Sequence, residues 1–385
     1  MMQTNLIPAM DPNPLPAPYW LFKLLLIVTF FLHILAMNFM LGGGVLALTA
    51  KWRHKKSADG NLADGNRMFF DIARKLPSLL PATVTLGIAP LLFVQVLYGQ
   101  YFYASSIIIA WPWFLVLVML CAAYYSFYFA SFQTGQNHRR ASAAMLFSMI
   151  LVFVIGFLYS NNMTLSEVPS RWRAKYFANP SGWNLNLTEP TLIPRFLHFM
   201  VTAVAMGGLL LVFMAAANWK RDRVYARQLL QFGGKAFSYG TMAQLLVGLW
   251  FLASLPGEMR ILFMGANPLA TILLLVGFVG GIASIFMMAN ARRKENIRLA
   301  TWYVPGVTVV VILCMTWMRD ILRDAYLKPY FHPEQFVIKT QWEVLPLFLA
   351  LFIAGVIFWF IMLKRYGLFS GGKTTSTVIA IDSKA

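Results

Sequence analysis

The sequence predicts an all-α integral membrane protein. Of its 385 residues, 59% are hydrophobic and only 12% are charged, whereas soluble domains carry about 25% charged residues. Apolar runs recur along the chain, and each reaches the roughly 20 residues that a helix needs to cross a bilayer. Cys121 and Cys314 both lie inside apolar runs, which fits neither a disulfide framework nor a zinc site. The composition therefore excludes a soluble enzyme.

Nine membrane-spanning helices are predicted, as two related four-helix bundles plus one added helix. The apolar runs occupy residues 19–50, 78–100, 108–132, 142–160, 191–218, 236–255, 268–290, 301–318 and 343–363. The chain then divides into an outer N-terminal segment (1–18), the first bundle (19–160), an outer loop (161–190), the second bundle (191–318), an outer loop (319–342), the ninth helix (343–363) and a cytoplasmic tail (364–385).

The basic residues predict how the chain is oriented. Of its 32 Lys and Arg residues, 22 lie in the loops and tail on one side of the spans and 8 on the other. Because basic loops stay in the cytoplasm, the N-terminus is predicted outside and the C-terminus inside, in a bacterial-type inner (cytoplasmic) membrane. The net charge of +18 is mostly this topological signal. We expect lipid, and no nucleic acid, to contact the basic loops.

Two histidines, His33 and His198, lie inside predicted spans. An imidazole in hydrocarbon must find a hydrogen-bond or metal partner, because an unpaired polar group costs several kcal/mol there. Each histidine is followed nine residues later by a glycine pair, Gly42-Gly43 or Gly207-Gly208. Such pairs allow close approach of a neighbouring helix or a flat macrocycle. Neutral imidazole is a common haem ligand, so haem ligation and plain hydrogen bonding both stay open.

Several other residues bear on a haem site. Met315 and Met318 are further candidate ligands, and Arg195, one turn before His198, would either pair with a haem propionate or anchor the helix at the interface. None of the 14 carboxylates lies in the core of a predicted span, so no intramembrane proton relay is expected. The sequence also lacks the P-loop, CxxCH and HExxH motifs, which leaves nucleotide-driven transport, covalent haem and zinc-protease chemistry without support.

The helix around His198 resembles the fifth helix of subunit I of the cytochrome bd-type quinol oxidases. The residues that carry this resemblance are Pro194-Arg195-Phe196-Leu197-His198, Met206-Gly207-Gly208, Ala217-Asn218-Trp219 and Tyr225-Ala226-Arg227. The family's first to third helices are matched by His33 with Gly42-Gly43, Thr85-Leu86-Gly87-Ile88, Gln95, Gly99 and Phe127-Tyr128-Phe129. The resemblance covers about residues 19–255. It implies that His198 ligates a low-spin b-type haem and that His33 ligates a second haem.

Three departures from the family pattern limit what the resemblance implies. The third span, Trp113–Tyr125, has no glutamate where the family places residues for haem and proton delivery. The seventh span reads Thr271–Gly277, without the arginine and the methionine ligand of the low-spin haem. The outer loop that contributes to quinol binding is reduced to a dozen residues around Pro256-Gly257-Glu258. The chain is therefore predicted to be a divergent member that does not reduce oxygen, and quinol binding at the usual place is in doubt.

The sequence thus favours a membrane electron-transfer subunit of a respiratory complex, binding one or two b-type haems through His198 and His33 with Arg195 nearby. Electrons would pass between a membrane donor such as quinol and an outer-side cytochrome or iron-sulfur protein, and quinone is a further candidate cofactor. The residues expected to dock that partner are Trp172, Trp183, Arg319, Arg323 and Trp342. The alternatives are a haem-free subunit that anchors redox proteins, and a transporter built from two related halves.

The isolated chain, supplied with a reduced quinol, should consume no oxygen above the uncatalysed rate. The reason is that no predicted span supplies a carboxylate to relay protons and the seventh span lacks the family's haem-ligating methionine. An oxygen electrode measures the rate, with cyanide added to suppress contaminating oxidases. Cyanide-insensitive uptake that rises with the amount of chain would contradict the prediction.

Overall fold

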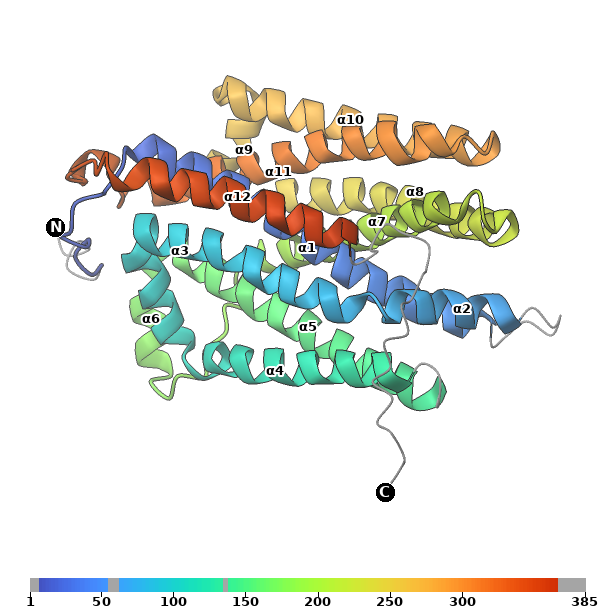
Figure 1. Ribbon diagram of the computed structural model, residues 1–385. Helices are drawn as coiled ribbons and strands as arrows, with labels where there is room; N and C mark the ends of the chain where they lie inside the picture. Colours follow the sequence, from blue (N-terminus) through green and yellow to red (C-terminus); the bar gives the residue numbers. More distant parts are fainter. Residues whose placement is uncertain (1–6, 55–61, 134–137, 366–385) are drawn as a thin grey trace.

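The computed structural model describes residues 7–54, 62–133 and 138–365, and the regular structure within these ranges is helical. Eight helices are long and apolar enough to cross a membrane. They are α1 (Tyr19–His54), α3 (Leu76–Ile109), α4 (Trp111–Phe132), α5 (His138–Ser166), α7 (Leu192–Asn218), α8 (Arg223–Ser254), α10 (Pro268–Arg293) and α11 (Val304–Leu327). With α12 (Val344–Arg365), they confirm the predicted all-helical, multi-pass membrane fold. Figure 1 shows these helices running along one common direction.

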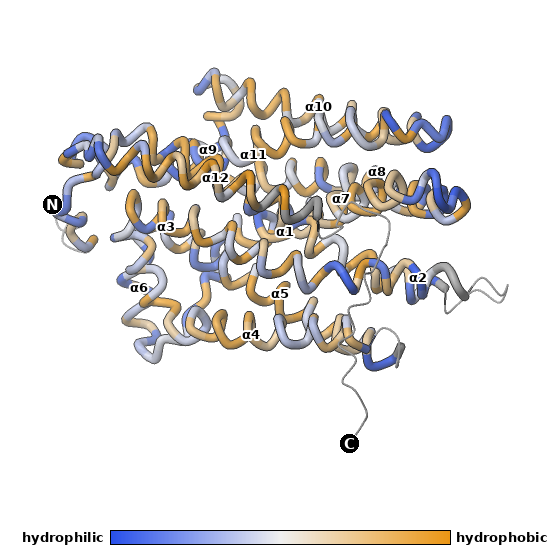
Figure 2. Tube along the Cα trace, viewed as in Figure 1, coloured by the Kyte–Doolittle hydropathy of each residue, from blue (hydrophilic) through white to orange (hydrophobic). Residues whose placement is uncertain are grey.

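Short helices lie at both ends of the long ones. They are α2 (Leu62–Ala73), η3 (Pro169–Arg171), α6 (Trp172–Ala178), α9 (Gly257–Ile261), η4 (Leu262–Ala266), η5 (Leu299–Tyr303) and η6 (Pro333–Gln335). In Figure 1, α6 lies at the same end as the N-terminus, and α2 lies at the opposite end. Figure 2 shows apolar residues along the middle of the helices and hydrophilic residues gathered at the two ends. This pattern is what a bilayer around the middle section requires.

Residues 7–18 of the N-terminal segment are not helical and are tied to the chain just before α12. The backbone N–H of Leu15 donates to the Val337 carbonyl at 2.8 Å, and the N–H of Lys339 donates back to the Leu15 carbonyl at 2.9 Å. Residues 55–61 of the predicted loop 51–77, and residues 366–385 of the predicted tail, lie outside the described residues. The orientation of the ends relative to the cytoplasm stays a prediction.

Several predicted loops are helical. Residues 101–107, expected to form a loop, are helical, because α3 continues to Ile109. The chain then reverses direction at Ala110, whose φ is 35°, and α4 begins at Trp111. The loop expected at 219–235 shrinks to four residues, since α8 begins at Arg223. The predicted spans were too short because hydropathy falls where polar side chains begin, whereas the helical hydrogen bonds continue beyond the membrane surface.

The outer loop predicted at 319–342 also begins later than expected. Helix α11 runs on to Leu327, so Asp320, Arg323 and Asp324 are helical, and Asp320 and Arg323 are buried. The four charges of Arg319 to Asp324 suggested a solvated loop. Charged side chains can be buried when they are paired, and here Lys23 of α1 forms ion pairs with Asp320 at 2.6 Å and Asp324 at 2.8 Å.

Helices α1 and α7, which carry the two histidines, meet backbone to backbone. A Cβ atom on Gly42 would overlap the carbonyl group of Ala203 and the amide of Gly207, and a Cβ on Gly207 would overlap Gly42. The second glycine of the α7 pair allows α7 and α8 to pack closely, since a Cβ on Gly208 would lie 2.5 Å from the carbonyl oxygen of Gly233 on α8. The glycine pairs are therefore helix-packing sites, which was one of the two predicted roles.

The two halves of the chain place their histidines alike. The His33 ring of α1 packs against Gly87 of α3, and a Cβ on this glycine would lie 2.8 Å from the ring. The His198 ring of α7 packs against Gly248 of α8, where a Cβ would lie 3.1 Å away. In each half, the histidine thus faces a glycine of the following long helix. This correspondence supports the prediction of two related units. The division of the chain into domains stays a prediction.

At the end opposite to the N-terminus, α2 is held against the turn between α7 and α8. Arg67 donates to Asp222 at 2.7 Å and stacks on the Tyr225 ring, whose hydroxyl donates to Asp71 at 2.8 Å. The Arg67 guanidinium also holds the pKa of Asp222 below its usual value. The predicted solvated loop 51–77 therefore contains an amphipathic helix that fixes this end of α7.

Replacing Gly42 with leucine should destabilise the protein by about 1–3 kcal/mol, because the added side chain would force α1 and α7 apart. Thermal unfolding in detergent, followed by circular dichroism, measures the effect. Gly306→Leu is the matched control, since no atom lies within 4 Å of a Cβ at that position. Equal melting temperatures for the two variants would show that the α1–α7 contact is not tight.

Candidate functional site

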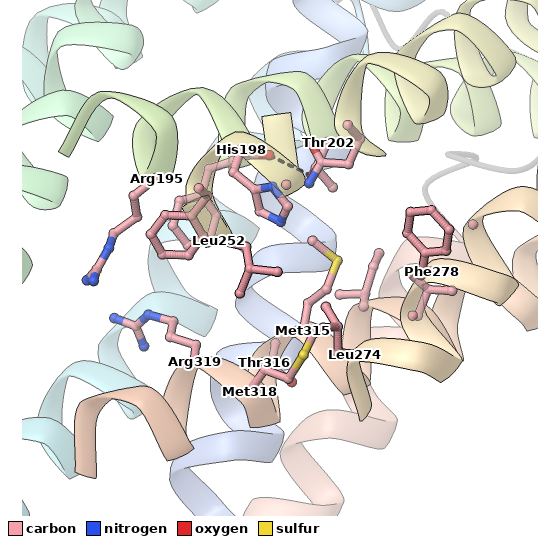
Figure 3. Close-up of a pocket in the computed structure, with 18 of the residues that line it drawn as sticks. Arg195, His198, Thr202, Leu252, Leu274, Phe278, Met315, Thr316, Met318 and Arg319 are labelled. Atoms are coloured by element: carbon pink, nitrogen blue, oxygen red, sulfur yellow. Dashed lines mark hydrogen bonds between the residues drawn. The ribbon is translucent and has the colours of Figure 1, made fainter. Parts of the chain in front are cut away.

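A cavity of about 410 Å³ lies among α1, α7, α8, α10 and α11, within the size range of pockets for small molecules and cofactors. Most of its lining is aliphatic or aromatic. The lining side chains with polar or sulfur atoms are Asn38, Glu167, Arg195, His198, Thr202, Thr241, Gln244, Met315, Thr316, Met318 and Arg319. Five of the residues singled out from the sequence therefore meet at one place, which Figure 3 shows in close-up: Arg195, His198, Met315, Met318 and Arg319.

His198 points into the cavity from α7 (Figure 3). Its Nδ1 atom is buried and has no hydrogen-bond partner in the described part of the chain. The ring rests against Gly248 and lies near Phe251, at 6.1 Å between ring centroids. An imidazole whose Nδ1 is buried without a partner is costly, so the site favours a bound group that the His198 ring can hold.

Two methionines of α11 line the same cavity. Met315 extends from α11 toward His198, and Met318 lies one turn closer to the arginine end (Figure 3). A thioether opposite an imidazole is a ligand pair that holds haem iron in cytochromes. The sequence predicted no methionine ligand within Thr271–Gly277 of the seventh span, and the part of the cavity lining that α10 supplies includes no methionine. Met315 and Met318 were predicted only as further candidates. The tertiary structure brings α11 to face α7.

Two arginines and one carboxylate form one end of the cavity. Arg195 of α7 is buried and pairs with the buried Glu167 at 2.7 Å between Nη1 and Oε2. Arg319 of α11 faces Arg195 (Figure 3) and stacks on the Phe30 ring at 4.3 Å. The Nε atom of Arg195 is buried without a hydrogen-bond partner. Two positive charges against one negative charge suit an anionic group at this end. Arg195 is therefore not an exposed interfacial anchor, the alternative considered from the sequence.

His33 occupies a different position from His198. Its Nδ1 atom lies 3.0 Å from the Thr83 carbonyl oxygen, which fixes Nδ1 as the protonated nitrogen and leaves Nε2 as the acceptor. His33 is not among the lining residues of the cavity, although its neighbours Phe30 and Ile34 are. The structure therefore groups His198 with Arg195 and does not group His33 with them. Haem ligation by His33 stays a prediction.

A buried ionic cluster joins α1, α3 and α11 near the arginine end. Lys23 donates to the Tyr98 hydroxyl at 2.8 Å, and this hydroxyl donates to Asp324 at 2.7 Å. Arg323 lies 3.4 Å from Asp320, the other partner of Lys23. Asp320, which the sequence placed just beyond the eighth span, lies within α11 and is buried. Its burial could not be predicted, because the sequence does not reveal which cation lies opposite.

The predicted docking surface is only partly exposed. Trp172 is buried and donates from its indole nitrogen to the Leu165 carbonyl at 2.8 Å, and Arg319 and Arg323 point into the helix bundle. These three residues cannot contact a partner because the fold uses them internally. Trp183 and Trp342 are exposed, as are Tyr176 and Phe177 of α6. A partner at this end would meet the exposed aromatics.

The fold has a relative among solved structures. A chain of the bd oxidase from Geobacillus thermodenitrificans superimposes with a TM-score of 0.70, over 90% of this chain and 97% of that chain, at 15% sequence identity. The protein has the fold of a bd oxidase chain. No protein-family model and no curated protein sequence matches this chain. The likeness confirms the predicted architecture, and at this identity it concerns the fold alone.

Replacing Arg195 with methionine should destabilise the protein by about 3–5 kcal/mol, because Glu167 would remain buried without a counter-charge. The double variant Arg195→Met with Glu167→Gln should recover most of the loss, since neither residue is then charged. Chemical denaturation in detergent measures all four members of this cycle. Additive losses in the double variant would contradict a direct pair.

Proposed function

We propose that the chain is an electron-transfer subunit of a membrane redox complex and holds a b-type haem in the cavity beside His198. The observation that carries this proposal is the buried imidazole of His198, whose Nδ1 has no hydrogen-bond partner among the described residues and which faces Met315 across an apolar cavity. The bound haem would supply reversible one-electron chemistry. The fold supports the proposal, because the solved structure that it resembles is named as a bd oxidase.

The roles of the chain's own residues follow from their positions. His198 of α7 and Met315 of α11, which line the cavity from facing helices, would hold the haem iron. Arg195 and Arg319 would pair with the propionate groups, whose negative charge the excess positive charge of that end requires. The aliphatic and aromatic lining would exclude water and thereby set the redox potential. Because Glu167 already pairs with Arg195, Arg319 is the better-placed partner for an added anion.

The wider setting is also part of the proposal. The chain would act in a bacterial-type cytoplasmic membrane, next to other subunits, with a membrane donor such as quinol. Its cavity ends in the arginine pair at the N-terminal end of α7, the end at which α6 presents Tyr176 and Phe177. An electron path toward an outer-side cytochrome or iron-sulfur protein is therefore shorter from His198 than a path to the other end of the bundle.

The His198→Ala variant should lose the b-type haem while still inserting into the membrane, because insertion depends on the apolar length of α7. A pyridine haemochrome assay on the purified complex measures haem per chain. His332→Ala is the matched control, since His332 is exposed and lies outside the cavity. Full haem content in His198→Ala would refute the assignment. A wild-type complex without haem would instead favour the haem-free anchoring subunit.

The two methionines can be separated by the same approach. Met315→Leu should retain haem through His198 but change the reduced spectrum from low-spin to high-spin, because one of the two side chains that would hold the iron is lost. Met318→Leu makes the same change of side chain one helical turn away and should leave the spectrum unchanged. If Met318→Leu alone shifts the spectrum, the ligand is Met318. Spectra unaltered in both variants would exclude a methionine ligand.

A further inference from the structure

The cavity contains two side-chain amides that the proposed haem site does not use. Asn38 of α1 and Gln244 of α8 both line it, and Asn38 is fully buried. All four polar atoms of the two amides are buried without a hydrogen-bond partner in the described part of the chain. Buried polar atoms are nearly always paired in native proteins, so this pair of amides indicates a bound group that supplies the missing hydrogen bonds.

The helix contacts place the two amides at the same depth. Gly42 of α1 meets Ala203 and Gly207 of α7, and Gly240 of α8 meets Ala205 of α7. Asn38 and Gln244 each lie four residues, about one helical turn, from these contacts on the side of His198. They therefore flank α7 close to Thr202, about one turn beyond His198 and away from the two arginines. Both residues line the same cavity, so one ligand bound there lies beside both side chains.

The surroundings of the amides define the chemistry of the ligand. The charged residues in the lining are Glu167, Arg195 and Arg319. Glu167 pairs with Arg195, which lies one turn from His198 on the side away from the amides. A ligand at the amide end is therefore neutral, because a charge there would be buried without a counter-charge. Each amide offers donor N–H groups and an acceptor oxygen. A carbonyl oxygen or a hydroxyl group on an apolar molecule satisfies these requirements.

The cavity also has an opening toward the membrane. Three of its lining residues are exposed on the surface of the spans, with exposed fractions of 50% for Leu249 of α8 and 57% and 39% for Leu275 and Phe278 of α10. One turn further along, α8 and α10 pack directly against each other, since Gly281 of α10 contacts Leu245 of α8. The opening therefore lies between α8 and α10 and is lined by apolar side chains, as suits an entrance from lipid.

We propose that Asn38 and Gln244 form a binding site for the carbonyl or hydroxyl group of a neutral, lipid-soluble molecule that enters between α8 and α10. Two sources supply this chemistry in a membrane, a quinone head group and a glycerolipid with a free hydroxyl. The site rests on the cavity and its amides, and not on haem ligation by His198. Its occupancy can therefore be measured whether or not a haem is present.

The test is ligand binding to the full chain in phosphatidylcholine nanodiscs, with decylubiquinone in one arm and dioleoylglycerol in the other. Replacing both amides by apolar groups of similar size, Asn38→Leu with Gln244→Met, should raise the Kd of the bound probe about tenfold, which corresponds to about 1.4 kcal/mol. The melting temperature should not fall, because the wild-type amides have no protein partner to lose. Haem content is read separately by pyridine haemochrome, so loss of haem and loss of the probe are distinguished.

A second pair of variants tests the entrance without touching the amides. Leu249→Trp should narrow the opening and weaken or slow binding, whereas Leu246→Trp, also exposed on α8 but outside the cavity lining, should not. Loss of one probe in the amide variant identifies its source, quinone or glycerolipid, and supports the site. The proposal is overturned if neither probe binds the wild-type chain, or if the amide variant binds as the wild type does.

Discussion

The structure depends on the backbone contact between α1 and α7, where Gly42 and Gly207 leave no room for a side chain. Between apolar helices in lipid there is little hydrophobic driving force, so close van der Waals packing must hold them together. This contact joins the two halves of the chain at their histidine-bearing helices. It also fixes where Asn38 of α1 lies along the helix axis relative to His198 of α7. The contact thereby helps to determine the shape of the cavity that both residues line.

Burial of charge follows a consistent rule in this bundle. Arg195 enters the protein because Glu167 meets it, and Lys23 enters because Asp320 and Asp324 meet it. In the described part of the chain, the charges are unbalanced at the cavity, where Arg319 adds a positive charge and stacks on an aromatic ring. This unbalanced charge lies near an imidazole whose Nδ1 is buried without a partner. Such an arrangement is expected of a cofactor site.

The fold could be predicted largely from the sequence, and the candidate site only in part. The lengths of the apolar runs predicted the helices. The glycine pair nine residues after each histidine predicted where neighbouring helices pack closely. His198 and Arg195 share a cavity because they are one turn apart on α7, a relation that the sequence shows directly. Met315 and Met318 of α11 could be predicted only as candidates, because which helix faces α7 depends on how the whole bundle assembles. Asn38 and Gln244 gave no signal, since a single amide in an apolar run has many local explanations.

The sequence by itself determined that the chain crosses a membrane many times, since hydropathy and length act locally and need no knowledge of neighbours. It also identified His198 as a residue that must find a partner. Only the tertiary structure decided which charges neutralise each other, why Trp172, Arg319 and Arg323 are unavailable to a docking partner, and where α11 and α8 complete a cavity around His198. Such pairings depend on contacts between residues distant in the chain, and helix packing alone brings those residues together.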